Sequence, residues 1–176
     1  MALGRNGSVW GSNIYGLFRS TKLTNEFKKL VEESNIKSIA CGHYFAVFLL
    51  DDGSVYSCGQ GPNGHLGLGG NALDVELPKK IDNLTDIQGI YCYMDGSLFI
   101  GGDGSVWKTG SGIFVPKKLE GFPPISVLCS STRSYEKVLF VDEDGAFWNS
   151  NGKQYPINSD MPICSRYAKS LKSARN

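Results

Sequence analysis

Apolar residues occur along this chain in short runs, separated by polar turns that contain glycine. The runs cover residues 46–50, 98–100 and 138–141, and a second set precedes them at 39–41, 90–92 and 127–129. Runs of three to five apolar residues between turn signals are typical of buried β-strands. The pattern therefore predicts an all-β chain built from many short strands.

One polar phrase recurs four times, and its last three copies come within three residues after the runs at 46–50, 98–100 and 138–141. It consists of Asn or Asp, then Gly, a small residue, an apolar residue and an aromatic residue, at 6–10, 52–56, 103–107 and 144–148. Its glycines are 46, 51 and 41 residues apart, a period that suits propeller blades or solenoid units. Asp-Gly between apolar runs is a strong hairpin signal, and it indicates a type I′ turn with positive φ. Each phrase predicts the tip of a hairpin.

Two segments have apolar residues at helical spacing. The first, residues 25–33, is only nine residues long, so it predicts a helical turn within a blade connection and not an independent helix. The second follows Pro162, where an apolar stripe predicts a short C-terminal helix; the stripe comprises Ile163, Tyr167, Leu171 and Ala174. The expected division is therefore a repeat-built domain over residues 1–158 and a helical tail over 159–176.

Composition narrows the classes of function. With 41% hydrophobic and 20% charged residues, the chain resembles an ordinary globular protein. A net charge of +1 provides no overall attraction to nucleic acid or to a membrane, so such binding would need a local patch. Neither a signal peptide nor an apolar run of membrane-spanning length is present. The expected location is the cytosol or the nucleus.

Residues 52–69 carry a longer motif, which reads DGSVYSCGQGPNGHLGLG. It resembles the repeat of the regulator of chromosome condensation family, which runs from an Asp-Gly tip through a Trp-Gly pair to a Gly-x-Leu-Gly-x-Gly close. The Cys-Gly pair of that family appears at Cys41 and Gly42. Cys58 stands where the family usually has Trp, Phe45 stands where it usually has His, and the later repeats lack the close. The resemblance covers residues 5–157.

This resemblance implies a partial β-propeller of three to four blades, about half of the seven-bladed ring of the founding member. It implies a protein-interaction scaffold of regulatory or signalling type, with no enzymatic chemistry. The alternative is a guanine-nucleotide exchange factor for a Ran-like small GTPase, the activity of the founding member, although no exchange loop can be matched. The expected partner is another protein, either a small GTPase or an acidic surface; nucleic acid is less favoured and a membrane is not expected.

An open arc of blades exposes apolar faces at both ends, and large exposed apolar surfaces mark interfaces. Three arrangements would cover these faces. The chain is a segment of a longer propeller, or two copies associate to close a ring, or the C-terminal helix caps one end.

Other motifs favour structural roles. Residues 59–64 spell G-x-G-x-x-G, but no helix-forming segment follows, so repeat turns explain the glycines better than phosphate binding does. The five cysteines contain no C-x-x-C pair, and three of them occupy equivalent strand positions, which is typical of small buried residues. His43 and His65 have no partner at ligand spacing, so loop packing is expected. We predict no catalytic residues, no cofactor and no metal site.

Lysine pairs repeat in register with the strands. The pairs are Lys28 and Lys29, Lys79 and Lys80, and Lys117 and Lys118. An apolar residue follows each pair, 10 or 11 positions before a strand cysteine. Equivalent positions on successive blades share one face or rim, so these six lysines predict a basic band that binds an anionic partner. The alternative is that lysines on outer strands discourage edge-to-edge pairing.

Overall fold

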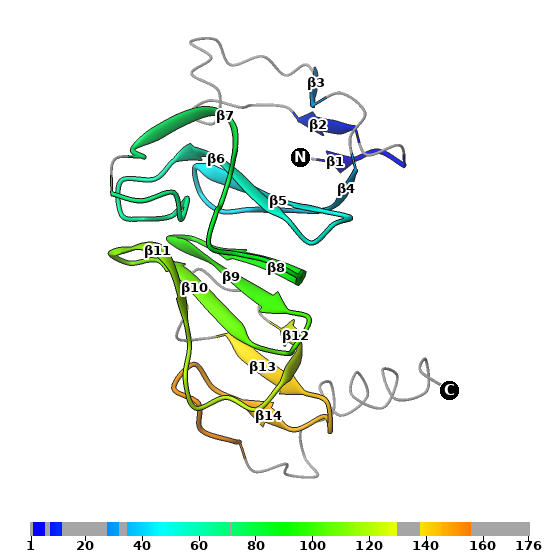
Figure 1. Cartoon of the computed structure of the whole chain (residues 1–176), viewed down its shortest axis with the longest axis vertical. Helices are drawn as coiled ribbons and strands as arrows, with labels where there is room; N and C mark the ends of the chain where they lie inside the picture. The colour runs from blue at the N-terminus through cyan, green and yellow to red at the C-terminus, as the bar shows by residue number, and fades with distance from the viewer. Residues whose placement is uncertain are drawn as a thin grey trace.

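The computed structural model describes residues 2–5, 8–11, 28–31, 35–70, 72–129 and 138–155. All secondary structure in these ranges is β-strand, which confirms the predicted all-β class. Four antiparallel sheets, A to D, follow one another in chain order (Figure 1). Sheets B and C are four-stranded, and each strand pairs with the next one in sequence, as expected for propeller blades.

Each sheet is a meander of short strands. Sheet A contains β1 (Ala2–Leu3), β2 (Val9–Gly11) and β3 (Lys28–Val31); sheet B contains β4 (Ile36–Cys41), β5 (Phe45–Leu50), β6 (Val55–Gln60) and β7 (Asp74–Lys80). Sheet C contains β8 (Ile87–Tyr93), β9 (Gly96–Gly101), β10 (Val106–Gly110) and β11 (Ile113–Lys118); sheet D contains β12 (Ile125–Cys129), β13 (Leu139–Asp142) and β14 (Phe147–Trp148). Five of the six apolar runs predicted as strands lie wholly in strands, and the run at 138–141 lies in β13 except for Val138, which directly precedes it.

The prediction for residues 25–33 was wrong where the structure describes them. Residues 28–31 form β3, which pairs with β2 through Val9 opposite Val31 and Trp10 opposite Lys29. A nine-residue segment gains little from isolated helix formation, and hydrogen bonding along a sheet edge outweighs its apolar spacing. The predicted C-terminal helix lies outside the described residues.

The Asp-Gly phrases form hairpin tips, as predicted, but the turn type differs. At the second tip, the amide of Gly53 donates to the carbonyl oxygen of Leu50 at 3.0 Å, and Gly53 has φ of 79°. Asp52 is not among the residues with positive φ. This is a type I turn followed by a left-handed glycine, in place of the type I′ turn, which needs two consecutive positive φ angles. Gly104 and Gly145 repeat the arrangement.

Hydrogen bonds join sheets B and C at both ends of their strands. At the tip end, the amide of Ile87 donates to the carbonyl oxygen of Gly53 at 3.1 Å. At the other end, the amide of Gly110 donates to the carbonyl oxygen of Gly64 at 3.1 Å. Gly64 belongs to the G-x-G-x-x-G string, and a Cβ there would overlap the backbone of Ile113. Turns, not a helix, follow this string, so its glycines permit blade packing.

Apolar side chains pack between the sheets in two clusters. The larger one joins sheets B and C through fully buried rings such as Phe48 and Phe99. The smaller one joins sheets C and D and includes Leu98 and Phe140. Because alternate residues of one strand point to opposite faces, Leu98 and Phe99 on β9 contribute to different clusters.

Three cysteines lie on the strands that the repeat predicts, but the expected burial was wrong for Cys41, which is exposed, while Cys92 is half-buried. Cys41, Cys92 and Cys129 are each on the first strand of a sheet. Cys58 is fully buried on β6, and burial raises the pKa of its thiol to about 12. Such a thiol remains protonated at neutral pH, in keeping with a packing role.

Candidate functional site

The predicted lysine pairs occupy equivalent places on three outer strands, which we define as β3, β7 and β11, the last strand of sheets A, B and C. In each sheet the second lysine of the pair lies opposite the aromatic residue of the tip phrase. The opposed pairs are Lys29 with Trp10, Lys80 with Tyr56, and Lys118 with Trp107. The sequence register therefore corresponds to one structural position, repeated from sheet to sheet.

Two further lysines extend this set. In sheet D the equivalent aromatic, Trp148, forms a bridge with Gln154, so Lys153 and Gln154 take the place of a lysine pair. In sheet C, Lys108 lies directly opposite Lys117. The sequence pattern does not predict either residue, because Lys153 stands beside Gln and Lys108 stands alone. Both lysines can be located only from the strand pairing near the aromatic residue of the tip phrase, Trp148 in sheet D and Trp107 in sheet C.

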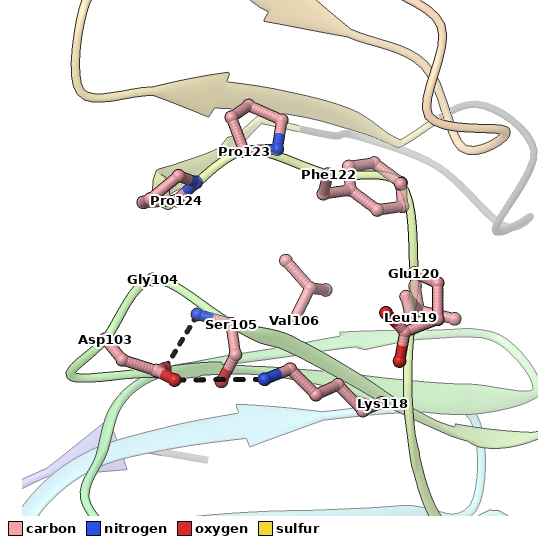
Figure 2. Close-up of a pocket in the computed structure, with 11 residues that line it drawn as sticks. Asp103, Gly104, Ser105, Val106, Lys118, Leu119, Glu120, Phe122, Pro123 and Pro124 are labelled. Atoms are coloured by element: carbon pink, nitrogen blue, oxygen red, sulfur yellow. Dashed lines mark hydrogen bonds and ion pairs between the residues drawn. The ribbon is translucent and has the colours of Figure 1, made fainter.

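The two lysines of a pair differ in their electrostatic surroundings. The Nζ atom of Lys118 lies 3.9 Å from Oδ2 of Asp103 at the tip of the same sheet (Figure 2). Lys80 likewise contributes to lowering the pKa of Asp52. Lys79 and Lys117 are exposed, and neither forms an ion pair within the described ranges. In the pairs of sheets B and C, the first lysine is therefore the one whose charge is available to a partner.

A cleft of about 220 Å³ adjoins Lys118 between sheets C and D. The tip residues Asp103 and Ser105 form one side, and Phe122, Pro123 and Pro124 lie across from them (Figure 2). Glu120 is exposed at the rim. The cleft thus combines an apolar wall with an ion pair that is already satisfied within the chain.

Partial burial changes the pKa of one lysine in sheet C. Lys108 is half-buried on β10, and burial lowers the pKa of its ammonium group. The equivalent residue of sheet B is Ser57, which is fully buried and donates to the carbonyl oxygen of Leu66 at 2.7 Å. Sheet C therefore places a cation where sheet B has a neutral hydrogen-bond donor.

Aspartates near the tips act as turn caps. In sheet C, the side chain and the backbone amide of Ser105 both donate to Asp103, the amide at 2.9 Å from Oδ1. The indole Nε1 of Trp107 donates to Oγ of Ser105 at 3.0 Å. In sheet D, where Ala146 replaces the serine, Asp142 accepts from both the Ala146 amide and the Trp148 indole. Each network fixes an aromatic next to a lysine position.

The Asp103 network predicts a pH dependence of stability. Hydrogen bonding from Ser105, and secondly the charge of Lys118, lower the pKa of Asp103. A lowered folded-state pKa adds stability above the unfolded pKa of about 4, and this stability is lost as pH falls through the folded value. We expect the urea midpoint of wild type to exceed that of Asp103→Asn at pH 7 and to approach it in acid. An equal difference at both pH values would refute this assignment; Asp82→Asn, an exposed carboxylate in a neighbouring connection, is the control.

Two features of the described residues bear on other functions. Within them, no group of three or more His, Cys, Asp or Glu side chains is arranged to hold a metal ion. No helix in the same ranges has the length and apolarity to cross a membrane.

Comparison with known proteins identifies the repeat. Two profiles described as "Regulator of chromosome condensation (RCC1) repeat" match residues 36–64 and 52–100. These ranges cover sheet B and half of sheet C.

Similar proteins carry the same repeat within longer chains. The X-linked retinitis pigmentosa GTPase regulator homolog of Caenorhabditis elegans is 26% identical over 84% of this chain and 12% of its own length. The human E3 ubiquitin-protein ligase HERC2 is 28% identical over 81% of this chain and 3% of its own length. The chain thus spans a small part of these relatives.

A solved structure shows the same fold. Prp20p from Saccharomyces cerevisiae, described with its binding properties to Gsp1p and histones, superposes with a TM-score of 0.64 at 17% identity. The match covers 98% of this chain and 44% of that one, in agreement with a partial propeller. Residues 36–100 of this chain belong to the regulator of chromosome condensation repeat family.

Proposed function

We propose that this chain is a regulatory protein-interaction module that recognises an acidic protein surface through the lysines of its outer strands. The carrying observation is that exposed lysines occupy the same register position on successive sheets. We call the surface formed by the lysine pairs of β7 and β11 the rim. Because the repeat places like charges side by side there, their electric fields add even though the chain is nearly neutral.

Protection of sheet edges accounts for only part of this rim. Lysine, proline and a local irregularity all discourage edge pairing, and the outer strands of sheets B and C have all three. However, Leu77 on β7 is 73% exposed and Val115 on β11 is 44% exposed, each two residues before the first lysine. Exposed apolar residues invite association, so edge protection does not explain them. An exposed apolar residue beside a free lysine on β7 and again on β11 suits a protein partner.

The relatives support binding as the common activity. They include a GTPase regulator homolog, a ubiquitin ligase and a protein described by its binding to Gsp1p and histones. Since this repeat occurs in proteins with different overall activities, we assign it recognition and no covalent chemistry. The identity of the acidic partner, and a nuclear or cytosolic location, remain part of the proposal.

The rim can be tested with a labelled decaglutamate peptide as the acidic probe. We expect the double variant Lys79→Ser, Lys117→Ser to bind it about two- to thirtyfold more weakly at low salt, since each of the two exposed ion pairs contributes about 0.2–1 kcal/mol. Fluorescence anisotropy measures the affinity. The matched control, Arg5→Ser with Lys37→Ser, removes the same charge from exposed positions away from the outer strands. An equal loss in the control would show that net charge, not the rim, binds the peptide.

A second candidate is nucleotide exchange on a Ran-like small GTPase, which the name of the C. elegans relative favours. The rate at which the GTPase releases labelled GDP distinguishes the two proposals. The interaction module predicts no acceleration when the chain is added. Acceleration that depends on the chain's concentration would replace our first proposal with the second.

A further inference from the structure

A second recess lies between sheets B and C, at the strand ends opposite the Asp-Gly tips. Its volume is about 250 Å³, which is enough for one side chain and less than a typical small-molecule site. Its lining includes His43, Tyr44, Gln60, His65, Met94 and Asp95. These residues come from the β4–β5 turn, the end of β6 and the loop after it, and the β8–β9 turn. Two blades must therefore pack together before the recess exists.

His65 is an unusual component of this lining. Its side chain is only 9% exposed and stacks on Phe45, with ring centroids 5.4 Å apart. Its Nε2 atom is buried and has no hydrogen-bond partner within the described part of the chain. An unsatisfied buried polar atom costs about 1–3 kcal/mol, so such atoms tend to have a functional reason. Because Nε2 has almost no exposed surface, a ligand donor would satisfy it only after the imidazole tilts toward the recess.

The charge and shape of the lining indicate which ligand fits. Among the described residues that line the recess, Asp95 alone carries a carboxylate, and none is a lysine or an arginine. The rings of His43 and Tyr44 lie 3.9 Å apart at 35° and offer an exposed aromatic surface. Gln60 adds an amide that can accept a hydrogen bond. A carboxylate, neutral acceptors and aromatic faces together suit a flat cation.

We infer that this recess binds an arginine side chain of a partner protein. A guanidinium group stacks on aromatic faces, pairs with a carboxylate and donates up to five hydrogen bonds in one plane. It can thus serve Asp95 and the neutral acceptors at once. Lysine presents its charge as a compact point and lacks the flat face, and an acidic or phosphorylated group would be repelled by Asp95.

The site is independent of the outer-strand lysines, which bind the opposite charge elsewhere on the blades. The probe is the peptide acetyl-Gly-Arg-Gly-amide, and its neutral counterpart has citrulline, nearly the same shape as arginine, in place of arginine. Binding to the full chain is followed by the NMR shift of the Met94 methyl group. We expect the arginine peptide to bind at least about fivefold more tightly than the citrulline peptide, because hydrogen bonds between charged groups are the stronger ones.

Two variants assign the recognition to named atoms. Asp95→Asn keeps the shape and should abolish the preference for arginine over citrulline. Asp82→Asn makes the same charge change on an exposed connection at the opposite end of the sheets and should retain the preference. His65→Phe preserves a ring against Phe45 and should weaken both peptides, because it removes the acceptor. The lysine variant of the rim should bind arginine as wild type does, so the two proposals can fail separately.

Equal binding of the arginine and citrulline peptides, or no shift of the Met94 methyl group with either one, would overturn the inference. A tyrosine peptide that bound more tightly than the arginine peptide, with Asp95→Asn unaffected, would also overturn it. Equal loss of preference in Asp95→Asn and Asp82→Asn would show that net charge, not the recess, is responsible.

Discussion

Replacing Gly110 by alanine is expected to lower the free energy of unfolding by about 4 kcal/mol, a large part of the stability of an ordinary domain. Gly110 has φ of 87°, which costs a non-glycine residue about 1–2 kcal/mol. An added Cβ would also overlap the carbonyl oxygen of Asp95 and approach Cα of Gly96 at 2.5 Å. Because these are backbone atoms, β8, β9 and β10 would have to separate, at an overpacking cost of about 1–3 kcal/mol. Urea unfolding measures the loss.

Gly112→Ala is a matched control in the next turn. Its φ of 85° is nearly the same, but nothing lies within 4 Å of an added Cβ. Only the backbone strain remains, so we expect a loss of about 1 kcal/mol. Similar losses in the two variants would show that conformational strain, and not the close approach of strands in sheet C, determines the need for glycine.

Phe99→Ala is expected to cost about 4 kcal/mol, within the range for truncating a buried phenylalanine. The ring on β9 is fully buried in the cluster that joins sheets B and C. Its removal leaves a cavity between two blades. The midpoint of thermal or urea unfolding should therefore fall, and sheets B and C should unfold less cooperatively. Leu77→Ala, at a position 73% exposed, should change stability by less than about 0.5 kcal/mol. A small loss for Phe99→Ala would mean that the sheets do not share a core.

The repeat could be found in the sequence because its parts are local. An apolar run before an Asp-Gly phrase specifies two strands and a tip, and the same register predicts the positions of the lysine pairs. The turn type was harder to predict, because Asp-Gly is compatible both with a type I′ turn and with a type I turn followed by a left-handed glycine. At the second tip, Gly53 takes positive φ and Asp52 does not. The secondary structure of residues 28–31 was ambiguous, because a segment of four residues is compatible both with a helical turn and with an edge strand.

The recess with His65 could not be predicted from the sequence. His43, His65 and Asp95 come from three connections that are distant in the sequence, and only blade packing brings them together. The distinction between Lys117 and Lys118 was also hidden, since it depends on which lysine reaches Asp103. These features are set by contacts between strands and sheets, which the period of the repeat does not specify.

The salt dependence of decaglutamate binding tests most directly whether the outer strands form a binding rim. Salt screens exposed charges, with a Debye length that falls from about 10 Å at 0.1 M to about 3 Å at 1 M. We predict that wild type binds more tightly than the Lys79→Ser, Lys117→Ser variant at low salt and that the two affinities converge as salt increases, while the Arg5→Ser, Lys37→Ser control follows wild type. A difference that is absent at low salt, or that persists unchanged at high salt, would contradict a rim that recognises an acidic partner by charge.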